Sequence, residues 1–149
     1  MGKPKDNCRQ SGCPVAYSLD VFGDKWTLVI IRDMLMAGKR HYGEFLNSRE
    51  RIASNILADR LKKLEEAGIV SKETDPGNQA KIIYTLTPRG VDLIPLFLEI
   101  VLWGTQHAVY TDTPPELIDK IKEDRAGTIL KIVACHKNNE SFVAKHNWV

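Results

Sequence analysis

The chain has 149 residues, of which 43% are hydrophobic and 27% are charged, and its formal net charge is +2. These values suit one compact domain with its own core and an extra helix or two. The longest apolar run, 93–103, is interrupted by Pro95 and Glu99 and is far shorter than the roughly 20 residues of a membrane span. Residues 1–6 lack the apolar core of a signal peptide, so we expect a cytoplasmic protein without a membrane partner.

Residues 1–12 are polar and are expected to form a flexible N-terminal arm. The apolar spacing over 15–22 predicts a short helix. Asp24 is then a suitable N-cap for a helix over 25–36. That second helix is apolar on most of its circumference, so we expect it at the centre of the core, with Trp26 as an anchor.

An extended basic connector, 39–41, leads to a helix of one to two turns over 42–46. After a turn, residues 52–68 carry apolar side chains at steps of three and four, which predicts an amphipathic helix. Gly68 is expected to end it, because glycine easily adopts the left-handed conformation found after helices. Two strands joined by a polar turn at 75–78 follow. This order predicts a winged helix-turn-helix, in a fold that is mainly α with a small β-ribbon.

Thr87 and Pro88 are typical of a helix start, and apolar residues continue to Gly104, where we expect that helix to end. Pro95 removes a backbone hydrogen bond from its interior, so the helix should bend. The helix has more apolar surface than one flank of a small core can cover, which favours pairing with a second copy of the chain. The expected dimer interface comprises Leu93, Phe97, Ile100, Val101 and Trp103.

A linker over 110–115 precedes a last amphipathic helix over 116–133, which Gly127 is placed to interrupt. Residues 136–149 have no clear periodicity, and we assign no structure to them. The chain is therefore divided into an N-terminal arm (1–12), a DNA-binding and dimerisation domain (13–107), and a linker with a C-terminal helical extension (108–149).

Several short motifs in this domain together resemble one known family. They are Cys13-Pro14-Val15, Gly23-Asp24-Lys25-Trp26-Thr27-Leu28, Ile31-Arg32-Asp33, Arg60-Leu61 with Leu64-Glu65-Glu66-Ala67-Gly68, Tyr84-Thr85-Leu86-Thr87, and Trp103-Gly104. The segment from Cys13 to His107 resembles the HxlR-type regulators, a bacterial branch of the winged-helix proteins related to MarR. The resemblance implies a homodimeric transcription factor that dimerises through its terminal helices and is nucleoid-associated when bound to DNA. It also implies that helix 54–62 enters the major groove, and that most relatives repress.

Short polar side chains near the start of this recognition helix are suited to contact base edges. Asn55 can pair with adenine N6 and N7, Ala58 can contact a thymine methyl group, and Asp59 can accept from cytosine N4. Ser54 is a further candidate and is expected to cap the helix. The same four residues would also suit an ordinary solvated helix face.

Positive charge is concentrated in the winged-helix part of the chain. Residues 25–90 hold 12 Lys and Arg against 8 Asp and Glu, a net of +4, whereas residues 91–149 hold 6 against 8, a net of −2. Cations that flank a groove bind phosphates, although any single surface lysine is equally well explained by solvation. The candidate backbone and wing contacts are Lys39, Arg40, Arg49, Arg51, Lys62, Lys72, Gln79 and Lys81.

Cys13 precedes the first helix, where the helix dipole and nearby cations favour a reactive thiolate. It is a candidate redox sensor with Cys8 as a resolving thiol, and the alternative is a thiol without a signalling role. Cys135 is expected to be structural. The spacing of these residues and His136 does not match the paired ligands of structural zinc, so we expect no metal and no cofactor.

The chain lacks a glycine-rich phosphate loop, a nucleophile elbow and a His-Glu-x-x-His motif, so we do not expect an enzyme. The leading hypothesis is a dimeric regulator that binds double-stranded DNA at a specific operator. The alternative is a winged-helix module for protein interaction, which Asp59 and Glu66 on the outer helix face would favour. The sequence identifies no effector.

Overall fold

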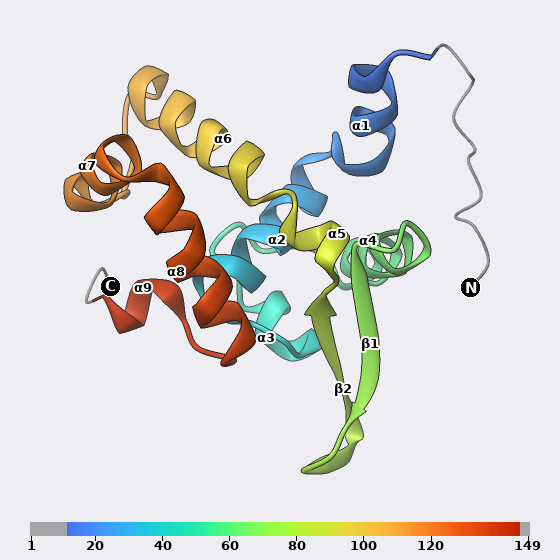
Figure 1. Ribbon diagram of the computed structural model, residues 1–149. Coiled ribbons are helices and arrows are strands. Elements are labelled where there is room, and N and C mark those ends of the chain that lie inside the picture. Colours follow the sequence, from blue (N-terminus) through green and yellow to red (C-terminus); the bar gives the residue numbers. More distant parts are fainter. Residues whose placement is uncertain (1–11, 147–149) are drawn as a thin grey trace.

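The structure is a computed structural model that describes residues 12–146, so the predicted arm lies outside it apart from Gly12. Within these residues, helices surround a core and a two-stranded antiparallel sheet projects from them, which confirms the predicted fold class (Figure 1). None of the helices between residues 12 and 146 is long and apolar enough to cross a membrane. The helices are α1 (Pro14–Phe22), α2 (Lys25–Met36), α3 (Tyr42–Leu46), α4 (Ser54–Glu66), α5 (Pro88–Val91), α6 (Ile94–His107), α7 (Pro115–Glu123), α8 (Arg125–Lys137) and α9 (Phe142–Lys145), and the strands are β1 (Val70–Asp75) and β2 (Asn78–Leu86).

Helix α2 lies at the centre of the core and packs against α4, α8 and α9. Its side chains Ile30, Ile31, Met34 and Leu35 are at most 2% exposed. The Asp24 carboxylate accepts hydrogen bonds from the backbone N–H groups of the first turn, 2.7 Å from the nitrogen of residue 26. The predicted start and the predicted central position of this helix are thus confirmed.

Helix α4 buries Leu57, Leu61 and Leu64. Its last residue is Glu66, and Gly68, with a φ of +71°, follows the helix end as predicted. The expected capping role of Ser54 is wrong. The N-cap residue is Ala53, which has extended backbone and no side-chain acceptor. Ser54 is already the first helical residue, so its hydroxyl is free of the capping role and contacts a neighbouring helix instead.

The two strands form the wing, which extends away from the helical body (Figure 1). Val70 pairs with Leu86, and the pairing continues to the turn at 75–78. The connector before α3 pairs briefly with β2, because the Tyr84 N–H donates to the Arg40 carbonyl at 2.8 Å. This contact, with an isolated bridge between residues 41 and 83, joins the wing to the helix-turn-helix.

The predicted bent helix over 88–104 is in fact two helices, α5 and α6. Thr87 caps α5 as expected, accepting from the Gly90 N–H at 3.2 Å. Pro95 lies in the first turn of α6, where backbone N–H groups have no acceptor within the helix, so a proline there costs no hydrogen bond. Pro95 therefore begins a helix and does not bend one, and that helix continues past Gly104 to His107.

The predicted helix over 116–133 is also divided, at Asp124 and not at Gly127. The Asp124 carboxylate accepts from the Gly127 N–H at 2.9 Å and so caps the start of α8. Helix α9 lies in the segment to which no structure was assigned, and its Phe142 side chain is only 1% exposed.

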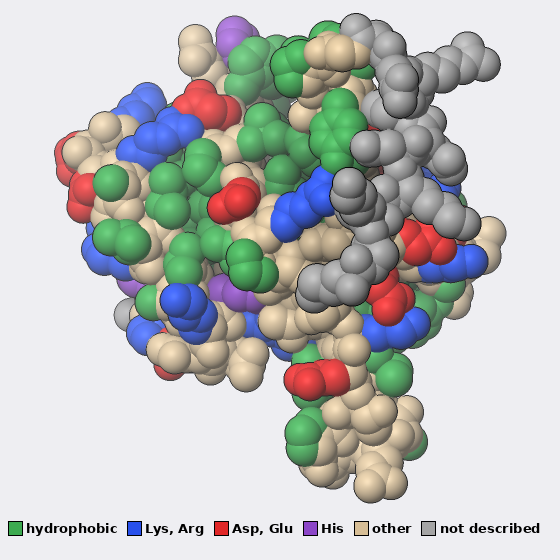
Figure 2. All heavy atoms as spheres, turned by 45° about the vertical axis from the view of Figure 1, so that its right-hand side comes forward, with side chains coloured by type: hydrophobic (Ala, Val, Ile, Leu, Met, Phe, Trp, Pro, Cys, Tyr) green, Lys and Arg blue, Asp and Glu red, His purple; other side chains and the backbone are tan. Residues whose placement is uncertain are grey.

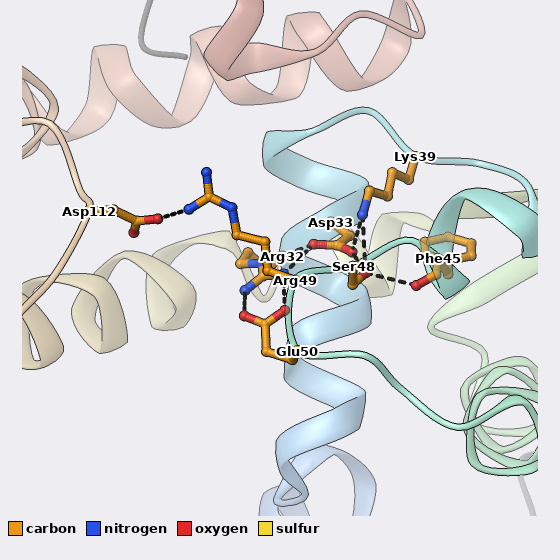
Figure 3. A network of polar contacts seen from close by, with 8 residues as sticks. All are labelled: Arg32, Asp33, Lys39, Phe45, Ser48, Arg49, Glu50 and Asp112. Carbon is orange, nitrogen blue, oxygen red and sulfur yellow. Dashed lines mark hydrogen bonds and ion pairs between the residues drawn. The ribbon is translucent and has the colours of Figure 1, made fainter.

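A buried carboxylate, that of Asp33 in α2, joins the core to the turn of the helix-turn-helix (Figure 3). It accepts from Arg32 Nη2 at 2.6 Å, from Lys39 Nζ at 2.8 Å and from the Ser48 hydroxyl. Arg32 also donates to Glu50 Oε2 at 2.9 Å. This hydrogen bond lowers the pKa of Glu50 to about 2, so its stabilising effect is complete above pH 4.5 and is lost as the pH falls toward 2.

We predict that Asp33→Asn lowers the free energy of unfolding by about 1 to 3 kcal/mol, because it removes the charge of a buried group that pairs with the partly buried Arg32 and Lys39. Urea unfolding at neutral pH measures the change. Asp112→Asn is the matched control, since Asp112 pairs with Arg49 at the exposed surface and should contribute less than about 1 kcal/mol. Equal, small losses in both variants would contradict a structural role for the Asp33 network.

Candidate DNA-binding surface

The outer face of α4 gathers five of the residues expected to meet DNA. Ser54, Asn55, Ala58, Asp59 and Lys62 are all exposed. Their steps of one, three and four residues place them on one side of the helix, opposite its buried leucines. The structure thus presents the candidate base-contacting side chains together, at the first turns of a helix whose other face is fixed in the core.

The start of α4 is held by a tyrosine that the sequence did not single out. Tyr42 Oη of α3 donates to the Ser54 carbonyl oxygen at 2.7 Å and lies 2.6 Å from the Ser54 hydroxyl. This contact fixes the helix end that is expected to approach base edges. No local pattern identifies it, because its main acceptor is a backbone atom twelve residues away.

Ion pairs neutralise the acidic group on this face. Asp59 bonds to Arg60 and lies 3.0 Å from Lys63 Nζ, and the Lys63 hydrogen bond is the main cause that lowers the pKa of Asp59. Arg60 also bonds to Asp24, the cap of α2, and so ties α4 to the core helix. Arg60 therefore has a structural role in the free protein.

The wing carries exposed polar and positive side chains beside α4. Lys72 Nζ lies 3.0 Å from Glu65 Oε2, a contact that raises the pKa of Lys72. Such exposed pairs contribute little to stability, so a DNA phosphate can replace Glu65 at low cost. Gln79 and Lys81 are exposed near the tip of the wing.

His41 connects the tip-proximal end of β1 to the helix-turn-helix. Its Nε2 lies 2.9 Å from Asp75 Oδ2, and its Nδ1 lies 3.3 Å from Glu44 Oε2. The Gly77 N–H, and after it His41, lower the pKa of Asp75. His41 was recognised only as part of a basic connector, and its partner on the wing could not be inferred from spacing.

Two of the expected phosphate contacts are not available to DNA. The prediction for Arg40 is wrong because its side chain is buried, with 5% exposure, and donates to the His136 carbonyl oxygen. Lys39 is bound to the buried Asp33 carboxylate and lies 3.1 Å from the Ser48 hydroxyl, so it too is removed from the set.

The other two basic residues before α4 remain at the surface. Arg49 is exposed and directed toward Asp112 (Figure 3), and Arg51 is exposed with a positive φ of 55°. Both lie in the connection between α3 and the recognition helix.

A second surface, formed by α1 and α6, is apolar. Helix α1 has no buried residue, and its Val15 and Leu19 are 64% and 57% exposed. On α6, Ile100 and Trp103 are 42% and 68% exposed. Figure 2 shows hydrophobic side chains gathered in the upper half of the molecule, at the height at which Figure 1 shows these helices.

Not every residue expected at a dimer interface belongs to this apolar surface. Leu93 and Val101 are partly buried. Phe97 is only 7% exposed and packs within the core of its own chain, so its assignment to the interface is wrong.

Cys13 is exposed and forms the N-cap of α1. Cys135 is 2% exposed, and burial raises the pKa of its thiol, as suits a structural residue. Cys8 lies outside the described residues. Between residues 12 and 146 no group of three His, Cys, Asp or Glu side chains is arranged to hold a metal ion.

Comparison with known proteins places this geometry in a family. Residues 21–112 match the model of the HxlR-like helix-turn-helix. The HTH-type transcriptional regulator YybR of Bacillus subtilis is 36% identical over 95 residues, which cover 64% of this chain and 75% of YybR. YodB, an HTH-type transcriptional regulator of the same species, is 35% identical over 102 residues, which cover 68% of this chain and 90% of YodB.

Among solved structures, the redox regulator HypR in its oxidized form matches with a TM-score of 0.59 at 34% identity. The match covers 66% of this chain and 100% of the HypR chain. Helices α7–α9 lie beyond the residues that the family model matches. The chain belongs to the HxlR family of winged helix-turn-helix transcriptional regulators.

Proposed function

We propose that this regulator binds a specific operator as a homodimer in the bacterial cytoplasm and represses transcription from it. The observation that supports this most is the exposed polar face of α4 beside a wing with an exposed Lys81 and Gln79. A helix fits the major groove, and a ribbon next to it reaches the adjacent minor groove and backbone. The relatives are named as transcriptional regulators, which favours this function over a protein-interaction module.

In this arrangement Ser54, Asn55, Ala58 and Asp59 meet base edges, and a set of exposed polar groups meets the backbone. Asn55 supplies the donor and acceptor that match adenine. Arg60 and Lys63 both contact Oδ2 of Asp59, so Oδ1 would accept the hydrogen bond from cytosine N4. The backbone and wing contacts are Arg49, Arg51, Lys62, Lys72, Gln79 and Lys81.

Titration of the purified protein with the promoter DNA of its own and neighbouring genes tests the proposal. We expect a mobility shift that weakens steeply with salt, because bound cations release counterions from the phosphates. Association with a protein partner, together with no salt-sensitive shift on any of these fragments, would favour the interaction-module alternative and overturn DNA binding.

Two alanine variants separate base contacts from backbone contacts. Asn55→Ala should weaken binding to the operator by about 1 to 3 kcal/mol and leave random DNA almost unaffected. Lys81→Ala should weaken binding to operator and random DNA alike. It should also reduce the slope of log K against log salt concentration by about one, the value for one phosphate contact. Dissociation constants on both DNAs at several salt concentrations measure this. Equal losses on both DNAs for Asn55→Ala would refute its base contact.

The homodimer is supported by the apolar surface of α1 and α6. A helix such as α1, with no buried residue in its own chain, gains little from folding alone. Its hydrophobic residues, with Leu96, Ile100 and Trp103 on α6, would be covered by the same surface of a second copy. A two-fold dimer would present two α4 helices to half-sites separated by about one helical turn.

We predict that Trp103→Glu converts the dimer to a folded monomer, because it places a charge in an apolar interface without disturbing the core. Sedimentation equilibrium measures the mass, and circular dichroism checks the fold. Leu130→Glu is the matched control, since Leu130 is similarly exposed, at 69%, but lies on α8. A dimer of unchanged stability in the Trp103 variant would remove α6 from the interface.

Cys13 is proposed as a redox sensor that acts on this interface. It is exposed at the N-terminal end of α1, where an oxidant can reach its sulfur. HypR is named a redox regulator, which supports the idea. Hydrogen peroxide would transfer one oxygen atom to the thiol and leave as water, and the sulfenic acid would condense with the Cys8 thiol to form a disulfide and a second water.

Peroxide should weaken operator binding by the wild type about tenfold or more, and dithiothreitol should restore it. Cys13→Ser should bind equally well before and after peroxide, whereas Cys135→Ala, the control, should respond like the wild type. Fluorescence anisotropy with labelled operator measures the affinities. Release of Cys13→Ser from DNA by peroxide at the wild-type level would exclude Cys13 as the sensor.

A further inference from the structure

The guanidinium of Arg40 is buried and forms no ion pair with a carboxylate between residues 12 and 146, although the charge of Glu44 stabilises it from beyond ion-pair distance. Its Nη2 donates to the His136 carbonyl oxygen at 2.6 Å, and its Nη1 lies 3.4 Å from His136 Nε2. Its Nε has no hydrogen-bond partner between residues 12 and 146. A guanidinium keeps its charge in proteins, so its burial is costly unless fixed dipoles stabilise it.

The end of α8 supplies that stabilisation. His136 is in the last turn of α8, where the carbonyl groups lack partners within the helix and carry its partial negative charge. Burial, and next to it Arg40, lower the pKa of His136 to about 4, so near neutral pH its ring is uncharged and Nε2 can accept from Arg40. The contact joins residues 96 positions apart in the chain.

The backbone of Arg40 belongs to the wing and to α3. Its carbonyl oxygen accepts from the Tyr84 N–H of β2 at 2.8 Å. Its own N–H donates to Glu44 Oε2 of α3 at 2.7 Å. One residue therefore contacts α8 through its side chain and the wing through its main chain.

The C-terminal helices approach this connector at a second point. Ser141 Oγ donates to the Met36 carbonyl oxygen at 3.2 Å. Gly38 has a φ of +68°, and a side chain there would lie 3.0 Å from the backbone of Glu140 and Ser141. Residues 36–40 are thus held at two points, by the end of α8 and by the residues at the start of α9, and both of these helices pack against α2 (Figure 1).

We propose that Arg40 and His136 are positioning residues that couple the C-terminal helices α7–α9 to the wing. Displacement of the end of α8 would release the connector, loosen its hydrogen bond to Tyr84 and change the position of the wing on DNA. Arg40 acts through the wing and touches no DNA itself. The consequence for affinity rests on the proposed DNA-binding function, whereas the coupling itself is a property of the free protein.

Hydrogen exchange in the DNA-free protein tests the coupling. Arg40→Met keeps the apolar stem and removes the guanidinium, and it should speed exchange of the Tyr84 amide by about tenfold relative to amides of α4. Ser141→Ala removes the hydrogen bond to the Met36 carbonyl oxygen and should also speed exchange of the Tyr84 amide. It replaces Arg40→Met in the test if that variant does not fold. Arg125→Met is the matched control, because Arg125 joins the other end of α8 to Glu99 and Pro95 of α6. It should leave Tyr84 exchange unchanged.

A double-mutant cycle on operator DNA tests the consequence. In the Arg40→Met protein, Lys81→Ala should weaken binding less than about twofold, because the wing is already displaced, while Asn55→Ala should have its full wild-type effect. Full additivity of Arg40→Met and Lys81→Ala would overturn the positioning role. Unchanged Tyr84 exchange in a folded Arg40→Met or Ser141→Ala protein would overturn the coupling. Failure of the wild type to bind DNA would overturn the proposed function, and the exchange result would still decide the coupling.

Discussion

Helix α2 packs against α4, α8 and α9, and the positions of the functional elements follow from that packing. Its apolar residues hold the leucine face of α4, so the polar face of α4 must point outward. The buried Asp33 carboxylate fixes the turn before α4 through Ser48, and Asp24 holds the middle of α4 through Arg60. The recognition helix is therefore held by apolar packing on α2 and by polar contacts that start on or next to α2, while Tyr42 of α3 holds its first residue.

Elements of the candidate site could be predicted where a pattern in neighbouring residues determines them. Apolar spacing and Gly68 define α4, and its polar positions follow from the same spacing. Arg40 and Lys39 were misassigned because positive charge in a connector does not reveal a partner such as His136, which is 96 residues away. The role of Pro95 was wrongly predicted, because a proline can either bend the interior of a helix or stand in its first turn. Tertiary packing decides between the two. The division of the chain at residues 107 and 108 remains a prediction.

The C-terminal helices change how the connector before α3 is understood. In the sequence, residues 39–41 are three basic side chains next to a DNA-binding motif. In the structure, the three have three different tasks: Lys39 binds the buried Asp33, Arg40 binds the end of α8, and His41 binds Asp75 of the wing. Positive charge here serves internal contacts between elements, and the proposed phosphate contacts lie in the turn before α4, in α4 itself and in the wing.

Chemical footprinting of the full chain on its operator tests most directly that α4 and the wing together bind DNA as a two-fold dimer. Methylation interference and hydroxyl-radical protection are measured on both strands of one fragment. We expect interference at guanines in two major-groove segments about one helical turn apart, with protected minor-groove backbone beside each segment. A single segment, or protection spread evenly along the fragment without major-groove interference, would contradict it.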